Sequence, residues 1–381
     1  MKPVRTESRP PSLLVRGVIY PVGSWRGRPS AHASTIALGP KEGDLQKLYV
    51  TWFAGTGEGR LDVAVAFCEV TYEPDEVRTW RSSVSDEEFD PFDPPPGPFN
   101  YSKPRVIADD PNRACGNPVL YWDPSTGRFH LWYAAFYAKG SEVPPGEDPH
   151  RRDVFYKHSD DGVSWSEPVV WSDRPGLWVR APLVVLRDGT WLLPINDEAT
   201  YLPDFGHDWS SRFAVSRDRG KTWEFSRLYS VPKVPGRERH GMIQPSVVQL
   251  SDGSLYCLNR SHTGWMTQMR SAPGGRLGLD WTEPENSPLP NNNSGICVTR
   301  LRAGARSDDH LLVAYNPTTS ERYPISIAES LDGGRTWRRL FDLRDEVGEL
   351  SYPCLVQAPD GLLHCTYTLH RLTIAHDAFL L

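Results

Sequence analysis

An eight-residue turn signal that occurs three times constrains the fold of this chain more than any other feature. It reads Ser-Arg-Asp-Arg-Gly-Lys-Thr-Trp over 216–223 and Ser-Leu-Asp-Gly-Gly-Arg-Thr-Trp over 330–337. The copy over 158–165 has His158 where the other two begin with Ser. In such a turn the Asp side chain accepts hydrogen bonds from backbone N–H groups, and the Gly takes a conformation that a Cβ disfavours. The signal therefore predicts three tight turns between strands, each covered by its Trp.

The spacing of the copies predicts a repeat. Asp160, Asp218 and Asp332 lie 58 and then 114 residues apart, and 114 is two periods of 57. This period predicts a degenerate copy near residue 275, where a Ser-Ala-Pro-Gly-Gly run leads to Trp281, and another that ends at Trp80. A repeat of this length is typical of one four-stranded blade of a β-propeller. We therefore expect one all-β domain over residues 1–381 with six blades.

Composition and chain ends agree with this architecture. The 31 Gly and 35 Pro residues suit many short strands separated by turns, and helical periodicity is scarce. The apolar segment 13–22 precedes the first full blade, whereas the last blade offers only three strands, near 352–357, 361–367 and 372–379. We expect the N-terminal strand to complete the last blade, which closes the ring and covers an exposed sheet edge.

Charge and cysteine usage exclude several functions. The net charge of −6 without a basic run argues against a nucleic-acid partner. No apolar stretch is long enough to span a membrane, and the first residues lack the apolar core of a secretion signal, so we expect a cytoplasmic protein. The six cysteines, of which we place only Cys115 in a loop, show no metal-ligand spacing. They are interpreted as small buried thiols in a reducing compartment, and neither a metal nor another cofactor is expected.

Propeller geometry selects the candidate site residues. The inner strand of each blade begins at one rim of the central channel, and the loop between the second and third strands opens on the same face. Polar residues at these positions are therefore expected to converge although they lie far apart in the sequence. They are His32, Glu58, Asp62, Asn117, Arg180, Asp197, Glu198, Gln244, Arg260, Asn293, Asn316, Arg322, Tyr352 and Arg371.

The turn signal is the Asp-box, and the chain resembles the sialidase (neuraminidase) superfamily of β-propellers. The resemblance implies that Arg260 and Arg322 hold a substrate carboxylate, which arginine forks do bidentately. It implies that Tyr352 is the nucleophile, which avoids a carboxylate beside an anionic substrate. It also places the acid/base carboxylate in the loop that carries Glu58 and Asp62. In that family the boxes lie on the face away from the active site.

Two departures from the family pattern bear on the chemistry. The Arg-Ile-Pro motif of the first blade is absent, and His32 begins the corresponding stretch. The Glu that takes the proton of the family's nucleophile is replaced by Gln244, which has no useful basicity. Tyr352 therefore needs another base, or neighbouring arginines that favour its ionisation. Because Pro353 follows Tyr352, we expect an extended backbone at Tyr352.

Three functions fit these residues. The first is an exo-glycosidase that acts on a terminal acidic sugar of a glycan or glycoconjugate. The second is a polysaccharide lyase that acts on a uronate, with His32 or Tyr352 moving the proton. The third is a glycan-binding propeller without catalysis. For the glycosidase, the predicted catalytic residues are Tyr352, Glu58, Asp62 and Gln244, and the predicted substrate-binding residues are His32, Asn117, Arg180, Glu198, Arg260, Arg322 and Arg371.

Overall fold

A computed structural model of the chain describes residues 5–6, 10–80, 89–138, 141–148, 151–172, 174–198, 208–231 and 240–381. These residues form strands throughout and one short helix, which confirms the all-β prediction. The chain divides into two compact units. Unit 1 consists of Met1–Pro10 and Gly176–Tyr352, and unit 2 of Pro11–Pro175 and Pro353–Leu381. Whether the chain is one domain stays a prediction.

Two sheets of unit 2 are formed by the segment before residue 175. The first contains β3 (Ser30–Glu42), β4 (Leu45–Gly55), β5 (Ala64–Tyr72) and β6 (Asn100–Tyr101), and β7 (Arg105–Ala108) also pairs with β5. The second contains β8 (Ala114–Asp123), β9 (Arg128–Phe136), β10 (Arg152–Ser159) and β11 (Val169–Val170). The prediction of a loop at Cys115 is wrong, because β8 already pairs with β9 there.

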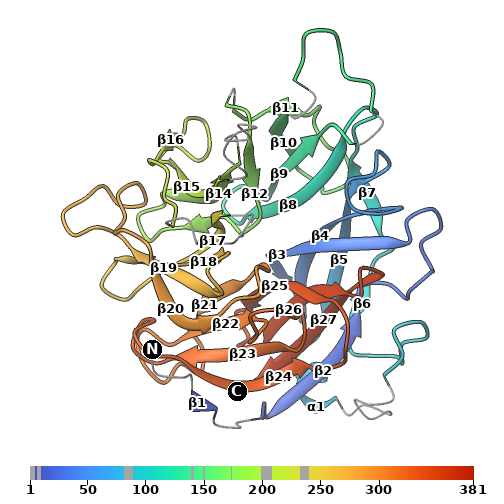
Figure 1. Cartoon of the computed structure of the whole chain (residues 1–381). Coiled ribbons are helices and arrows are strands. Elements are labelled where there is room, and N and C mark those ends of the chain that lie inside the picture. Colours follow the sequence, from blue (N-terminus) through green and yellow to red (C-terminus); the bar gives the residue numbers. More distant parts are fainter. Residues whose placement is uncertain are drawn as a thin grey trace. The chain divides into compact units, whose positions relative to one another are not determined.

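The third sheet joins the two ends of unit 2. Its order is β2 (Leu13–Val18), β27 (Thr373–Leu380), β26 (Leu363–Leu369) and β25 (Leu350–Gln357). Strand β2 runs antiparallel along β27, from Leu13 opposite Leu380 to Val18 opposite Ala375 (Figure 1). The predicted pairing of the N-terminal strand with the last strand is confirmed. It covers the edge of β27, which would otherwise expose unpaired backbone groups.

Unit 1 also contains three antiparallel groups of strands. The first is formed by β12 (Leu177–Val179), β13 (Val184–Val185), β14 (Trp191–Asp197), β15 (Asp208–Ser216) and β16 (Glu224–Phe225). The second is formed by β17 (His240–Gln249), β18 (Leu255–Ser261), β19 (Trp265–Arg270) and β20 (Glu285–Pro290). A two-residue parallel pairing of β15 with β17 links these two groups into one sheet. The third group is formed by β21 (Cys297–Arg300), β22 (Leu311–Tyr315), β23 (Ile325–Ser330) and β24 (Arg338–Arg344), and β1 (Arg5–Thr6) pairs parallel to β24.

The turns at 216–223 and 330–337 have the predicted hydrogen bonds. Asp218 accepts from the Thr222 N–H at 2.8 Å, and Asp332 accepts from the Thr336 N–H at 2.9 Å. The Ser that opens each turn donates to its Asp at 2.8 Å and accepts a backbone N–H from the turn glycine. Each Asp thus accepts hydrogen bonds from donors within its own turn, so the turn is formed by contacts between residues that are close in the sequence.

The first copy of the signal begins one residue later than predicted. Ser159, not His158, donates to the carboxylate of the turn, and that carboxylate belongs to Asp161, which accepts from the N–H groups of residues 163 and 164 at 2.7 Å. Asp160 instead pairs with Arg128. The assignment of His158 and Asp160 was wrong because this turn is one residue shorter. With Asp161 in place, the first spacing becomes 57 residues.

The two degenerate copies differ from each other. Near residue 275, the Trp281 indole N–H donates to the Gly278 carbonyl at 3.0 Å, just as the Trp223 indole N–H donates to the Gly220 carbonyl at 3.1 Å in the turn over 216–223. The copy predicted to end at Trp80 is wrong, because the helix α1 (Pro74–Thr79) lies there. A proline and two acidic residues in its first turn favour helix initiation.

Among the described residues, no helix is long and apolar enough to span a membrane.

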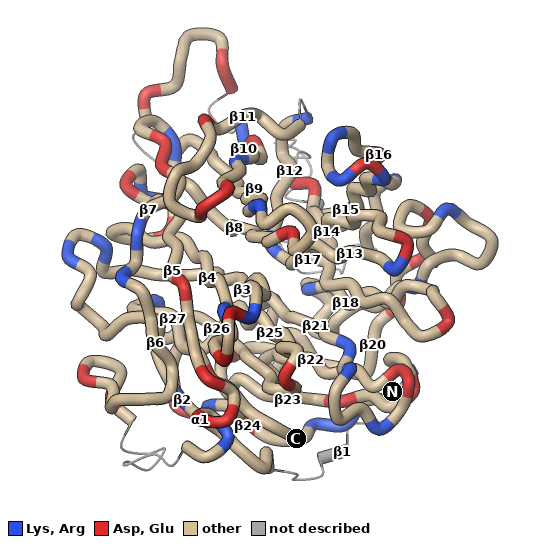
Figure 2. Tube along the Cα trace, turned by 180° about the vertical axis from the view of Figure 1, so that it is seen from behind, with Lys and Arg blue, Asp and Glu red and all other residues tan. Residues whose placement is uncertain are grey.

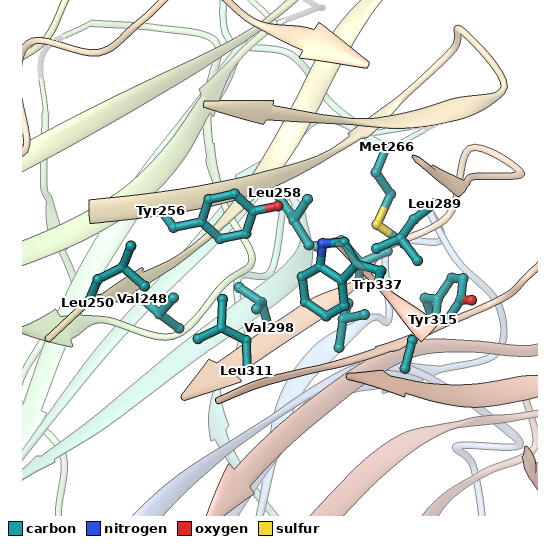
Figure 3. Close-up of a cluster of buried hydrophobic side chains, with 13 residues drawn as sticks. Val248, Leu250, Tyr256, Leu258, Met266, Leu289, Val298, Leu311, Tyr315 and Trp337 are labelled. Atoms are coloured by element: carbon teal, nitrogen blue, oxygen red, sulfur yellow. The ribbon is translucent and has the colours of Figure 1, made fainter. Parts of the chain in front are cut away.

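Both units have apolar cores between their sheets. In unit 1, thirteen buried residues from β17 to the turn after β23 form one cluster, in which Trp337 packs near Tyr256, Met266 and Leu289 (Figure 3). In unit 2 a second cluster includes Phe67 and Phe129. All six cysteines are buried thiols, as the sequence predicts.

Charged residues gather in turns and at strand ends along the chain trace (Figure 2). Glu329 on β23 is an exception, because its carboxylate is fully buried. Burial by itself raises the pKa of this carboxyl, but bonds from His310, Arg306 and Arg338 outweigh that effect and lower the pKa to about 2. The bonds of Glu329 connect β23 to β24 and to the loop before β22.

Candidate active site

Three arginines of unit 1 surround the ring of Tyr352, which lies on the first residues of β25. The guanidinium carbons of Arg180, Arg260 and Arg322 lie 5.2, 5.8 and 5.7 Å from the ring centroid. Tyr352 is 7% exposed, so most of the ring is enclosed. The convergence expected of these four residues from the sequence is therefore present within one unit.

The backbone of Tyr352 is not extended, and that prediction is wrong. Its φ is +56°, in the left-handed region that residues with a side chain rarely occupy. Asn117 and Gln244 also have positive φ before a proline, at 42° and 55°, and each lies in a bulge of its strand. A bulge re-aims a side chain, and strand pairing here overrides the local preference set by the following proline. Backbone strain of this kind is common at functional sites.

Arg260, at the end of β18, makes the closest contact with the tyrosine hydroxyl. Its Nη1 donates to the Tyr352 Oη at 2.5 Å and to the Gln244 Oε1 at 3.3 Å, and its Nε donates to the Asn293 Oδ1 at 2.8 Å. The guanidinium also lies 5.0 Å from the Trp209 ring centroid. Burial lowers the pKa of Arg260, and its interaction with Tyr352 opposes this shift. A buried arginine with these partners is held in one orientation.

Gln244 completes the surroundings of the tyrosine hydroxyl. Its amide Nε2 lies 3.4 Å from the Tyr352 Oη and donates to it, while its Oε1 accepts from Arg260. Since arginine has only donors, this assignment of the amide is the one that satisfies both partners. Two donors therefore point at the Tyr352 oxygen, and Gln244 has no group that takes a proton from it.

Arg322 is held by the segment that leads into β25. Its Nη1 donates to the Glu349 Oε1 at 2.7 Å, and the same oxygen accepts from the Ser351 hydroxyl at 2.9 Å. The Leu350 N–H donates to the Arg322 carbonyl at 2.8 Å. These bonds fix Arg322 relative to Tyr352, because its partners Glu349 and Leu350 lie within the three residues that precede Tyr352.

Arg180 and Glu198 come from the ends of β12 and β14. Arg180 is 2% exposed, and its guanidinium lies over the Tyr352 ring. Glu198 is half-buried, accepts from the Asn196 amide at 2.8 Å and attracts the charge of Arg260. Six predicted residues of unit 1 thus form one cluster, which Glu349 joins through Arg322. They are Arg180, Glu198, Gln244, Arg260, Arg322 and Tyr352. Across the described residues, no group of His, Cys, Asp and Glu is arranged to hold a metal ion.

Comparison with known proteins places this chain in a family. A family model described as "BNR repeat-like domain" matches residues 46–365. The chain belongs to the BNR-repeat family of the sialidase superfamily. It is 27% identical over 289 residues to a curated sialidase of Bacteroides fragilis (strain YCH46), a match that covers 69% of this chain and 48% of that protein. This BNR-repeat chain therefore spans about half the length of the curated relative.

Solved structures of similar fold include several sialidases. The Hadza microbial sialidase Hz136 has a TM-score of 0.71 at 18% identity, covering 96% of this chain and 68% of that one. A protein of unknown function from Dyadobacter fermentans has a TM-score of 0.68 at 15% identity, covering 98% and 99%. The intramolecular trans-sialidase of Ruminococcus gnavus has a TM-score of 0.62 at 13% identity, covering 91% and 94%. At these identities the likeness shows the fold of the BNR-repeat chain.

The remaining residues predicted to be catalytic or substrate-binding lie in unit 2, and they are His32, Glu58, Asp62, Asn117 and Arg371. In the loop after β4, Glu58 pairs with Arg371, and Asp62 accepts from the N–H and hydroxyl of Thr56, both at 2.8 Å. Their roles as acid or substrate ligands beside Tyr352 stay predictions.

His32 and Asn117 are also in unit 2. His32 is 1% exposed, and its Nδ1 lies 2.8 Å from the Thr368 hydroxyl while its ring packs on Phe53. Asn117 lies in the bulge of β8. The roles of both residues as substrate ligands stay predictions, and the contacts of His32 are with the buried residues Thr368 and Phe53.

Sequence reasoning missed two residues of the cluster. Glu349 lies only three positions before Tyr352, and this closeness in the sequence is the signal that could have pointed to it. His262 follows β18, and its ring lies 4.4 Å from that of Trp209. No motif identifies His262, because its partners come from β15 and from the turn before β21.

Proposed function

We propose that this protein is a sialidase-like exo-glycoside hydrolase that removes a terminal acidic sugar from a glycan or glycoconjugate. The observation that carries the proposal is the convergence of Arg180, Arg260 and Arg322 on Tyr352. Like charges that are mostly buried repel one another at a cost, which an anionic partner offsets. A substrate carboxylate is such a partner, and arginine forks bind it bidentately.

Arg180 supplies the third cation of this site. The family resemblance expects an arginine in the first blade, where this chain has His32 instead. Arg180 comes from the end of β12, in a different part of the sequence, and reaches the same tyrosine ring as Arg260 and Arg322. We propose that it compensates for the missing arginine in carboxylate binding.

Tyr352 is the proposed nucleophile. Arg260 and Gln244 both donate hydrogen bonds to its oxygen, which favours the phenolate form. A phenolate needs no base to remove its proton, so the family's Glu, which Gln244 replaces here, is not required. The oxygen would attack the anomeric carbon as the glycosidic C–O bond breaks, and the leaving oxygen takes a proton from Glu58 or Asp62. Water then displaces the tyrosine, and the same carboxylate takes the proton of that water.

The test is hydrolysis of a fluorogenic sialic acid glycoside compared with a galactoside of the same aglycone. The proposal expects release from the acidic glycoside alone, because only this substrate presents a carboxylate to the three arginines. Equal rates with both glycosides would overturn it. Arg322→Ala is the companion variant, expected to lose the preference.

A lyase is the second candidate, favoured by the amide of Gln244 where the family has a carboxylate. In that reaction the arginines would neutralise a uronate carboxylate, and Tyr352 would move the proton. The burial of His32 and its contact with Thr368 count against His32 in that role. Ultraviolet absorbance from an unsaturated uronate, measured with a polyuronate as substrate, would identify this activity.

We also propose that the six antiparallel groups of strands are the six blades of one closed propeller. The completed sheet of β2 and β25–β27 supports this proposal, because each predicted blade then has its own antiparallel group. Small-angle X-ray scattering that fits an extended two-lobed particle would contradict it.

A further inference from the structure

Asn293 joins Arg260 to His262. Its side-chain Oδ1 accepts from the Arg260 Nε at 2.8 Å, and its Nδ2 lies 2.8 Å from the His262 Nε2. Its backbone has a φ of +61°, a conformation that asparagine tolerates better than most residues. The Asn293 N–H donates to the Asn291 Oδ1, and that same oxygen accepts from the Ser261 N–H of β18. The turn that carries Asn293 is therefore anchored to the strand that carries Arg260.

The chemistry of the amide fixes its orientation. Arginine has only donors, so the oxygen of Asn293 must face Arg260 and its NH2 group must face His262. The His262 Nε2 then has to be an acceptor, which requires a neutral ring with its proton on Nδ1. Asn293 can satisfy both neighbours only in this one arrangement.

This arrangement determines where the Arg260 guanidinium points. Asn293 holds the Nε edge, and the Trp209 ring lies 5.0 Å from the guanidinium carbon. The Nη1 edge is then directed at the Tyr352 oxygen, 2.5 Å away. Without Asn293, no acceptor holds the Nε edge, so the guanidinium plane can rotate and its Nη1 is no longer directed at the Tyr352 oxygen.

We propose that Asn293 is a positioning residue that aims Arg260 at the carboxylate of the substrate. The inference rests on the proposed function for the identity of the ligand, and on the contacts above for the role of the residue. It assigns His262 a supporting role, because the neutral ring accepts from the Asn293 amide. Neither residue needs to touch the substrate.

The experiment compares three variants. Asn293→Ala removes the acceptor for Arg260, and Asn293→Asp keeps it. Asn292→Ala is the matched control, because Asn292 lies in the same turn and donates to the Glu321 carbonyl instead of contacting Arg260. Calorimetry measures the affinity of each variant for sialic acid and for its methyl ester, which has the same ring without the charge.

Asn293→Ala is expected to weaken sialic acid binding about tenfold, whereas binding of the methyl ester and binding by Asn292→Ala stay within about twofold of wild type. Asn293→Asp keeps the acceptor but adds a negative charge beside Arg260, so this variant is judged by the position of Arg260 and not by its affinity for sialic acid. Equal losses for the acid and the ester, or no loss in Asn293→Ala, would overturn the inference.

Crystal structures of the two variants separate this inference from the proposed function. The Nη1–Oη contact of Arg260 with Tyr352 should be lost in Asn293→Ala and kept in Asn293→Asp. If wild type binds no sialic acid, the proposed substrate class fails, yet the position of Arg260 still decides the role of Asn293. An unchanged Arg260 in Asn293→Ala refutes that role whatever the ligand.

Discussion

Replacing Tyr352 with phenylalanine removes one oxygen and keeps the ring that the three arginines surround. That oxygen accepts from the Arg260 Nη1 at 2.5 Å and from the Gln244 Nε2 at 3.4 Å. Arg260 still has Gln244 and Asn293 as acceptors after the change. We therefore expect Tyr352→Phe to lower the free energy of unfolding by about 1.5–3 kcal/mol, the range for one hydrogen bond to a charged group.

The effect on turnover should be much larger than the effect on binding. The phenyl ring keeps its contacts with the arginines, so the dissociation constant for sialic acid should change by less than about threefold. Both proposed roles of Tyr352, as the nucleophile of a hydrolase and as the group that moves the proton in a lyase, require the hydroxyl. We expect turnover of an acidic glycoside to fall by far more than tenfold, which corresponds to about 1.4 kcal/mol of barrier.

The assay is steady-state hydrolysis together with thermal unfolding and calorimetric binding. Tyr229→Phe is the matched control, because its hydroxyl contacts the Leu279 carbonyl and the Trp281 N–H within the core of the same unit. It should lose comparable stability and keep its activity per folded molecule. Retention of more than about a tenth of the activity by Tyr352→Phe would show that this tyrosine only lines the site.

Four further outcomes are expected. Asp218→Ala should lower the melting temperature by a few degrees, because the N–H and hydroxyl of Thr222 lose their acceptor, with activity per folded molecule retained; loss of activity in a stable variant would place this turn at the site. Because the folded-state pKa of Glu329 is about 2, below that of the unfolded chain, its stabilisation should be complete above about pH 4.5 and lost as the pH falls toward 2; urea denaturation of wild type and Glu329→Gln tests this, and parallel pH curves would contradict it. Arg322→Ala should cost about 2–5 kcal/mol in transition-state binding of an acidic glycoside, measured as kcat/KM, and an unchanged value would remove Arg322 from the site. Deletion of residues 1–22 should expose the edge of β27 and cause aggregation that light scattering detects, whereas a monodisperse product would show that this edge needs no cover.

The sequence by itself determined the features that depend on short-range chemistry and on counting. The aspartates of the turns at 216–223 and 330–337 accept from donors within four residues, so their spacing in the sequence is sufficient to predict the bonds. The missing fourth strand of the last sheet identified the segment that starts at Leu13 as its partner. Arg260 and Tyr352 could be selected because each lies near the end of a strand that the repeat locates, and Arg322 because it shortly precedes such a strand.

Only the tertiary structure decided the features that depend on partners from other strands. Gln244, in the bulge of β17, and Tyr352, on β25, both have a positive φ, although the prolines that follow them favour an extended backbone. The Asn293–His262 contact and the Glu349–Arg322 pair join residues whose spacing follows no motif. Strand pairing and side-chain packing set these positions, and their free energies outweigh the backbone preferences of single residues, so no local pattern in the sequence contains them.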